Sequence, residues 1–205
     1  MDGLIAERFA GADRGEITMS KIAVIFPGIG YHADKPLLYY SARMAEREFG
    51  YQIVRVEYST SPENIKGDSE KIRQAVELYV SDALRCLQQA DVKEAETILF
   101  LSKSIGTIVA GACASELGIK TKNIYYTPLE ESFSIITPGS GIAFHGTADP
   151  WAVTAEVRKC AEEMGIPLYI TEEANHSLET GDALRDIRNL ATVMEHSRAY
   201  MADNL

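Results

Sequence analysis

The sequence predicts an α/β fold: a doubly wound, mostly parallel sheet of about six strands with helices on both faces. Three observations lead to this class. Short apolar runs recur along the chain, longer segments with helical character separate them, and Pro or Gly stands at many of the junctions. Strands and helices that alternate in this way form parallel sheets covered on both faces. With 205 residues, of which 46% are hydrophobic, the chain can build one domain with a substantial core.

The first elements follow a stretch with no clear pattern. Residues 1–19 are treated as an N-terminal arm, and the core is expected over 21–202. The run KIAVIFP at 21–27 is apolar, partly β-branched and bounded by a Pro-Gly pair, which is typical of a buried strand. A helix is expected over 36–49 because a proline opens it and a glycine follows its end. YQIVRVEY at 51–58 predicts the second strand.

The middle of the chain repeats the pattern. A loop rich in Ser, Thr, Pro, Asn and Gly leads into a long helix, which Asp68 or Ser69 can cap and which runs to about Gln89. ETILFLS at 96–102 predicts the third strand. SIGTIVAGACASELG at 104–118 predicts a helix that ends at a glycine, and its small residues let it lie close to the sheet.

A fourth strand is expected over 123–128. The short helix after it carries a capping box, in which Thr127 and Glu130 flank Pro128 at the first helical position. GIAFHG at 141–146 then predicts the fifth strand.

The remaining elements are a helix over 151–164, the strand PLYIT at 167–171 and an amphipathic helix over 181–202. No repeat, low-complexity tract or linker interrupts the series. Residues 1–205 are therefore expected to form a single domain.

Composition excludes several classes of function. The formal net charge of -10 and the pI near 4.9 disfavour binding to nucleic acid or to an anionic membrane surface. The cysteines Cys86, Cys113 and Cys160 are odd in number and widely spaced, so they predict small buried side chains rather than disulfides or a metal site. The charged N-terminus lacks the apolar core of a signal peptide, and no apolar run approaches the ~18 residues of a membrane span. A cytoplasmic location is the expectation.

The turn LSKSIGT, at the junction of the third strand and its helix, suggests a nucleophile. Ser102, Ser104 and Gly106 alternate as in the nucleophile elbow G-x-S-x-G, except that a serine replaces the first glycine. Small residues are needed because the central serine lies on a strained turn. Taken alone, Ser104 could equally be the N-cap of the helix.

A nucleophilic serine needs a base, and the base needs a carboxylate that orients it. The fifth strand runs into FHGTADPW, which contains Asp149, and the sixth is followed by EEANHSLE, which contains His176. Because parallel strands end at one edge of the sheet, topology can bring Asp149 and His176 to Ser104.

On these residues the chain resembles the α/β-hydrolases, in particular small lidless esterases, lipases and dienelactone-hydrolase-like proteins. The resemblance covers residues ~21–202, and G-T-A-D-P and A-N-H-S-L are common surroundings of the acid and the histidine in that family. It implies that Ser104 is the nucleophile, His176 the general base and acid, and Asp149 the orienting carboxylate. The implied activity is hydrolysis of a small ester, thioester or related acyl bond, with no cofactor.

The glycine loop PGIGYH has two interpretations. In the family, an N–H group after the early strand and the one after the nucleophile form the oxyanion hole, which here implies Ile29 and Ile105. Alternatively, Gly28, Gly30 and Ala33 match the dinucleotide fingerprint, with Glu57 as the ribose-binding acid. Pro36 argues against the second interpretation because it would fall inside the required helix.

Further residues are candidates with competing structural roles. Gly30, Tyr31, His32 and Trp151 could contact substrate, although His32 also suits a surface loop, and Tyr31 and Trp151 could pack loops onto the sheet. The four histidines offer no i, i+4 pair, so no metal site is expected.

Four charged or titratable residues near the expected site have less certain roles. Glu130 or Glu131 follows the fourth strand and could be the orienting acid in place of Asp149. Lys103 is adjacent to Ser104 in sequence but could point elsewhere. His145 lies near the end of the fifth strand and is expected to be structural, with its ring satisfied by the backbone.

The substrate is expected to be a small acyl compound. The interval of about 129–140, where this fold usually inserts a cap, is almost filled by the short helix, so an open cleft without a cap domain is expected. A protein of this fold that captures a ligand with little turnover is the alternative. The oligomeric state is not predicted.

Overall fold

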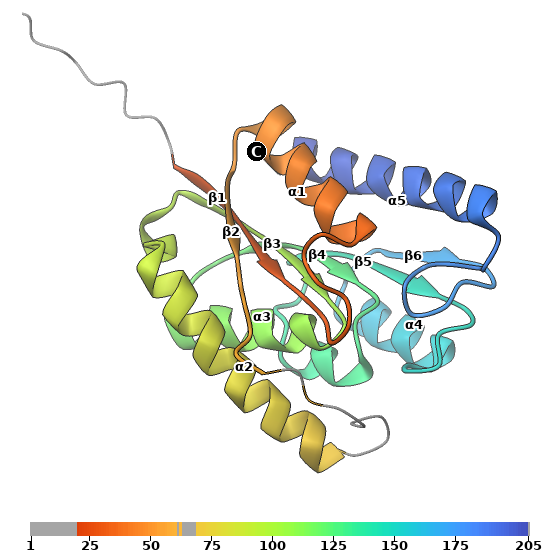
Figure 1. The fold of residues 1–205 in the computed structure, drawn as a ribbon, viewed down its shortest axis with the longest axis horizontal. Coiled ribbons are helices and arrows are strands. Elements are labelled where there is room, and N and C mark those ends of the chain that lie inside the picture. The colour runs from red at the N-terminus through yellow and green to blue at the C-terminus, as the bar shows by residue number, and fades with distance from the viewer. Residues whose placement is uncertain (1–19, 61, 63–68, 205) are drawn as a thin grey trace, which may run out of the picture.

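The computed structural model describes residues 20–60, 62 and 69–204. The proposed arm over 1–19 and the proposed cap at Asp68 lie outside these residues. The sheet has six strands in the order β2-β1-β3-β4-β5-β6, and all neighbouring strands run parallel (Figure 1). The strands are β1 Lys21–Phe26, β2 Gln52–Arg55, β3 Thr97–Lys103, β4 Lys122–Tyr126, β5 Gly141–Gly146 and β6 Leu168–Thr171.

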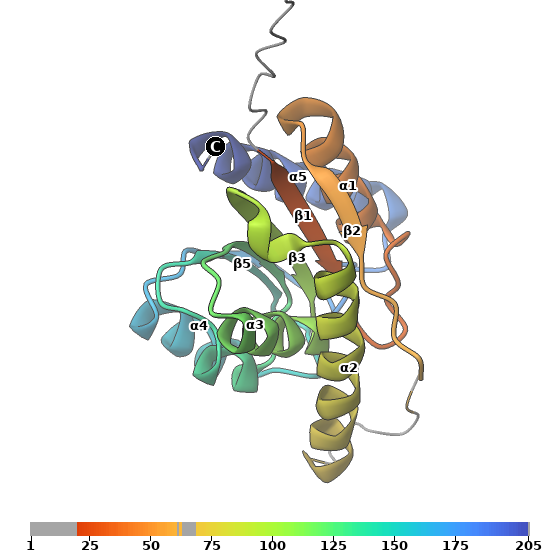
Figure 2. The ribbon, with the colours of Figure 1, turned by 90° about the vertical axis from the view of Figure 1, so that its left-hand side faces the viewer.

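Helices cover both faces of the sheet, which confirms the predicted doubly wound fold. They are α1 Pro36–Phe49, α2 Ser69–Gln89, α3 Ile105–Leu117, α4 Thr154–Glu163 and α5 Ala183–Asp203, with short 3-10 helices η1 Val92–Glu94 and η2 Glu130–Ser134. Helices α1 and α5 lie together on one face, and α2, α3 and α4 lie on the other (Figure 2).

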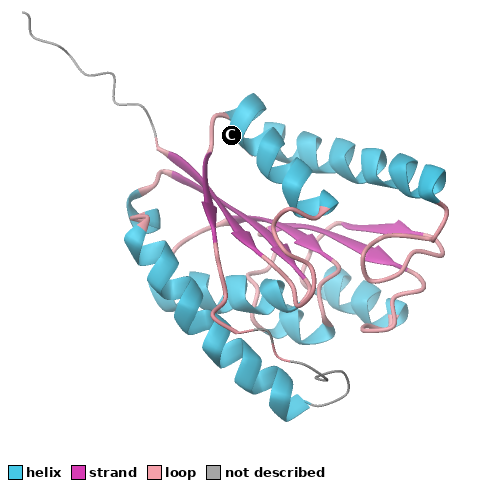
Figure 3. Ribbon diagram, in the orientation of Figure 1, coloured by secondary structure: helices cyan, strands magenta, loops and turns pink. Residues whose placement is uncertain are grey.

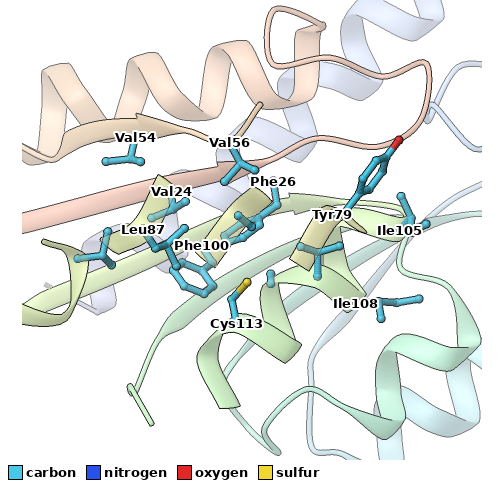
Figure 4. Close-up of a cluster of buried hydrophobic side chains, with 14 of the residues drawn as sticks. Val24, Phe26, Val54, Val56, Tyr79, Leu87, Phe100, Ile105, Ile108 and Cys113 are labelled. Atoms are coloured by element: carbon cyan, nitrogen blue, oxygen red, sulfur yellow. The ribbon is translucent and has the colours of Figure 1, made fainter. Parts of the chain in front are cut away.

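The apolar strand runs bury both of their faces. In β1, Val24 and Phe26 pack into the cluster shared with α2 and α3, whereas Ala23 and Ile25 pack toward α1 and α5. Figure 4 shows the first cluster, in which the Phe26 and Phe100 rings lie 4.7 Å apart. Full burial of such side chains contributes about 1.5–3 kcal/mol each. This explains why β1 is an unbroken apolar run rather than an alternating one.

Two predicted elements differ most from the structure, and the helix expected over 151–164 begins at Thr154. The strand expected over 51–58 is hydrogen-bonded as a strand only over Gln52–Arg55, because β2 is the edge strand and the chain leaves the sheet there. The capping box at Thr127 is wrong: the short helix is η2, it begins after Leu129, and no side chain caps it. Thr127 instead makes a tertiary contact near the candidate site.

The carboxyl ends of the strands share one edge of the sheet, and the loops that follow them gather there (Figure 3). The last turns of α5 lie at the opposite edge. Tyr200 donates its hydroxyl to the carbonyl of Ser140, which directly precedes β5, at 3.0 Å. The two edges are therefore separated by the length of the strands.

Candidate active site

The turn between β3 and α3 holds Ser104 in a strained conformation. Its φ of 55° and ψ of -127° lie outside the regions that a residue with a side chain normally adopts. Such a conformation costs on the order of 1–3 kcal/mol and persists only when its surroundings fix it. Here the Ser104 N–H donates to the carbonyl of Tyr126 at 3.0 Å, and the Ser104 carbonyl accepts from the Thr107 hydroxyl at 2.6 Å.

The small residues on either side of Ser104 fit this turn for different reasons. A Cβ on Gly106 would lie 2.4 Å from the Phe26 carbonyl oxygen, so only glycine allows α3 to start so close to the end of β1. Ser102, the residue that replaces the usual first glycine, is fully buried, and its hydroxyl donates to the Ile124 carbonyl at 3.5 Å. The replacement is thus accommodated with a hydrogen-bond partner in the neighbouring strand β4.

The structure brings the three sequence-predicted residues into one hydrogen-bonded chain. Ser104 Oγ lies 2.7 Å from His176 Nε2, and His176 Nδ1 lies 2.7 Å from Asp149 Oδ2. Because an ionised carboxylate only accepts, His176 donates from Nδ1, and Nε2 is left to accept the Ser104 proton. Asp149 Oδ1 accepts from the Trp151 N–H at 2.8 Å, so both carboxylate oxygens are engaged.

The loop that carries His176 is fastened to the end of β4. The Thr127 hydroxyl donates to the His176 carbonyl at 3.0 Å. Thr127 has a φ of 43°, which is unusual for a β-branched residue, and its N–H is held by the Phe144 carbonyl at 2.8 Å. Within the loop, the side chain of Asn175 accepts from the Ser177 N–H at 2.7 Å. These contacts fix the height of the imidazole above the sheet.

The electrostatics of the site favour an ionised acid and a neutral base. Burial by itself would raise the pKa of Asp149, but the hydrogen bond from His176, together with its charge and the Trp151 N–H, lowers that pKa overall. Burial lowers the pKa of His176, and the charge of Lys103 adds to this effect against the opposing hydrogen bond to Asp149. A neutral imidazole at pH 7 is the form that can accept a proton.

Lys103, next to the nucleophile in sequence, is buried beneath the site. Its side chain is 1% exposed, and its Nζ lies 5.1 Å from the centre of the Tyr31 ring. Burial lowers the pKa of this amine to about 7, although the negative charge of Asp149 opposes the change. Sequence reasoning left the direction of this side chain open, and its burial could not be inferred from the polar residue type.

The backbone N–H groups of Ile29 and Ile105, the two donors expected from the sequence, are not used by the turn and the helix that carry them. Gly28 and Tyr31 close a tight turn through hydrogen bonds of 3.1 and 3.2 Å, which use their own N–H groups and leave that of Ile29 outside the turn's bonds. Gly30 adopts a φ of 69°, which favours glycine at this corner. As the first residue of α3, Ile105 has an N–H that the helix itself cannot use.

A cavity of about 70 Å³ adjoins Ser104 and His176. Its other lining residues are apolar: Ile29, Ile72, Ile105, Leu129 and Trp151. Ile72 in α2 and Leu129 after β4 were not identified from the sequence. Leu129 could have been found because it follows a strand end at the edge of the site, whereas nothing local marks Ile72 among the apolar positions of its helix.

The other predicted substrate-binding residues lie elsewhere. Gly30 and His32 line a neighbouring groove of about 510 Å³ between the glycine loop and the end of β2, and Ile29 lines both this groove and the cavity beside Ser104. Tyr31 is 6% exposed and packs with the α1 and α5 cluster, where its hydroxyl accepts from the Leu37 N–H. Of the four candidates, only Trp151 lines the cavity beside Ser104.

The competing interpretations gain no support from the geometry. Glu130 accepts a hydrogen bond from the Val153 N–H at 2.9 Å, whereas Asp149 is the carboxylate bonded to His176. The dinucleotide interpretation needs a helix that begins at the glycines, but Gly28 lies in the closed turn and α1 begins only at Pro36. In the part of the chain that the structure describes, no cluster of His, Cys, Asp or Glu is arranged to hold a metal ion.

A search for similar proteins connects this architecture to solved structures. No family model matches the sequence, and no curated protein matches it significantly. The structure of Est1E from Butyrivibrio proteoclasticus with ferulic acid bound has a TM-score of 0.67 at 11% identity, over 90% of this chain and 89% of that one. XC6422 from Xanthomonas campestris, described as a serine hydrolase without a lid, has a TM-score of 0.60 at 17% identity, over 91% and 85%.

A third similar structure is an α/β serine hydrolase homologue from Coxiella burnetii, with a TM-score of 0.60 at 14% identity, over 87% of this chain and 85% of that one. At these identities the comparison defines the fold. The chain has the α/β-hydrolase fold, as its motifs predicted, and the solved proteins similar to it include serine hydrolases. Among the helices that the structure describes, none combines the length and apolar character needed to cross a membrane.

Proposed function

We propose that this protein is a serine hydrolase that cleaves a small carboxylic ester, thioester or related acyl bond through an acyl-enzyme intermediate. The observation that supports this most is the continuous chain from Ser104 through His176 to Asp149, with both hydrogen bonds at 2.7 Å. The strained backbone of Ser104 is a second support, because strain of this kind is found where a nucleophile is exposed on a turn.

Each residue of the chain has a distinct role in this proposal. His176 accepts the proton of Ser104 at Nε2 as the serine oxygen attacks the acyl carbon. The resulting oxyanion accepts hydrogen bonds from the N–H groups of Ile29 and Ile105. His176 then returns the proton to the leaving alcohol or thiol, and Asp149 stabilises the imidazolium between these steps. Water, activated by the same histidine, releases the acid and restores Ser104.

The cavity beside Ser104 favours a short acyl group. At about 70 Å³ and with apolar walls, the cavity is small, and we expect it to take an acyl group of a few carbon atoms. A further methylene adds about 0.8 kcal/mol of binding only when it is buried. Between β4 and β5 the chain forms η2 and its flanking turns, where a cap would otherwise be inserted. The walls around the acyl group would therefore be side chains of the cavity itself, including Ile72 and Trp151.

Covalent labelling tests the proposal. A fluorophosphonate should modify Ser104, located by mass mapping, and Ser104→Ala should abolish both the label and ester turnover. The neighbouring Ser102→Ala is the matched control and should keep the label on Ser104. A label on Ser102, or no label on folded wild-type protein, would contradict the proposal. Labelling of Ser104 without turnover of any ester or thioester would favour a protein that captures its ligand.

A further inference from the structure

We infer that His145 is a positioning residue that supports the Asp149 carboxylate at the oxygen that also accepts from His176. This inference rests on the proposed function. His145 lies in β5, four residues before Asp149, and both side chains are fully buried. Its Nδ1 is 3.8 Å from Asp149 Oδ2, the same oxygen that accepts the hydrogen bond from His176. One carboxylate oxygen therefore faces two imidazoles.

The hydrogen-bonding partners of His145 determine which nitrogen carries the proton. Its Nε2 lies 3.0 Å from the hydroxyl of Thr154, whereas its Nδ1 has no hydrogen-bond partner. A lone pair on Nδ1 would point at the negative oxygen of Asp149 and be repelled. A proton on Nδ1 is attracted to that oxygen, and the Thr154 hydroxyl can donate to Nε2. The arrangement thus favours the Nδ1–H form, in which the Thr154 hydroxyl donates to Nε2.

This contact departs from the role expected from the sequence. His145 was predicted to be satisfied by the backbone, but a side chain satisfies one ring nitrogen and the other faces the carboxylate. A buried ring nitrogen without a hydrogen-bond partner carries a desolvation cost. That cost is tolerated where the nitrogen stabilises the charge of a neighbouring group. Here the neighbour is the carboxylate that orients the proposed base.

The groups around His145 and Asp149 define the charge balance. Those that act on His145 are Asp149, Arg158 and Glu130, and burial lowers its pKa overall, which keeps the ring neutral near pH 7. Asp149 is faced by His176 and His145, and its negative charge also acts on the buried amine of Lys103. A neutral Nδ1–H dipole stabilises the ionised carboxylate without adding a second full positive charge beside His176.

The consequence for the proposed reaction is specific. Without His145, the carboxylate loses one of the groups that keep it ionised and aligned, so the imidazolium formed during proton transfer is stabilised less. Substrate contacts are unchanged because His145 does not line the cavity. The effect should therefore fall on kcat and on the pH profile rather than on KM.

The test uses His145→Leu, His145→Gln and Thr154→Val in the full chain, with p-nitrophenyl acetate as the substrate. We expect kcat to fall about tenfold in both His145 variants, the lower end of the cost of losing a supporting partner. KM should stay within about twofold, and the acid-side midpoint of kcat/KM should fall, because the protonated form of His176 is stabilised less when Asp149 loses this support. Thr154→Val removes the hydroxyl that donates to His145 Nε2 and anchors the ring, so it should give a smaller change in the same direction.

Thr192→Val is the matched control, because it removes a threonine hydroxyl from α5 on the exposed surface and should match wild type. Folded His145 variants with the wild-type kcat and pH midpoint would overturn the inference. If neither His145 variant folds, Thr154→Val decides it, and a wild-type profile there would overturn it. Failure of the proposed function looks different, since the wild-type protein would then show neither turnover nor labelling of Ser104.

Discussion

Replacing Lys103 by methionine should stabilise the protein, because the buried amine opposes folding. The unfolded lysine binds its proton up to a pH near 10.5, whereas burial lowers the pKa in the folded protein to about 7. Between these values the unfolded state binds more protons, so stability rises with pH. With about 1.4 kcal/mol for each pH unit, the amine reduces the free energy of unfolding by about 4 kcal/mol at pH 7 and by almost nothing above pH 10.5.

Methionine has a similar length and no charge, so Lys103→Met removes most of this cost. The contact of the amine with the Tyr31 ring is lost at the same time, and such contacts contribute about 0.5–2 kcal/mol. We therefore expect a net gain of about 2–3 kcal/mol at pH 7, which corresponds to about 4–12 °C in Tm for a chain of this length. The gain should shrink steadily as the pH approaches 10.

Urea denaturation of wild type and Lys103→Met at pH 7, 8, 9 and 10 measures this dependence. Lys122→Met is the control, because Lys122 is an exposed residue of β4, and its difference from wild type should stay small at every pH. A variant that is less stable than wild type at pH 7, or whose difference does not change with pH, would refute the reasoning. In that case the amine would be paired or hydrated in the folded protein.

Three further predictions concern activity. Because burial lowers the pKa of His176, kcat/KM for a short ester should rise with pH through a midpoint below ~6.5, and a midpoint above that value would contradict the assigned environment. Asp149→Asn should reduce kcat less than His176→Ala does, while Glu130→Gln should change it less than twofold. The reverse order for the two acids would place the orienting carboxylate after β4. In a p-nitrophenyl ester series, kcat/KM should be highest for acyl groups of two to four carbons. A maximum at twelve carbons or beyond would show an acyl tunnel, and Ile72→Ala should extend the preferred chain if the small cavity sets the limit.

The fold could be predicted because its signals are local. Each buried strand is a short apolar run, and Gly50 and Gly118 end two helices in left-handed conformations as their positions suggested. The order of Ser104, Asp149 and His176 along the chain, each after a parallel strand, was sufficient to predict that they meet at one edge. The contacts between their side chains also depend on the conformation of the turn that carries each residue. The sequence indicated that conformation only for the turn of Ser104.

The remaining features depend on contacts between distant segments. Thr127 has the residue type and spacing of a helix cap, but its hydroxyl is used by the loop of His176, 49 positions away. The partners of His145 and the burial of Lys103 are set by how the loops fold over the strand ends, which local patterns do not encode. Ile72 is an apolar residue of an amphipathic helix, and only the placement of α2 beside the strand ends makes it a wall of the cavity.

The position of the last turns of α5 determines how the protein can be attached to a surface. Tyr200 is bonded beside the amino end of β5, whereas Ser104, Asp149 and His176 follow the carboxyl ends of their strands. A linker or solid support joined beyond α5 would therefore leave the cavity facing away from the support. Immobilised in this orientation, the molecule should keep the access to substrate that it has in free solution. Coupling through Lys35, which lies beside the glycine loop, would instead turn the edge that carries the cavity toward the support.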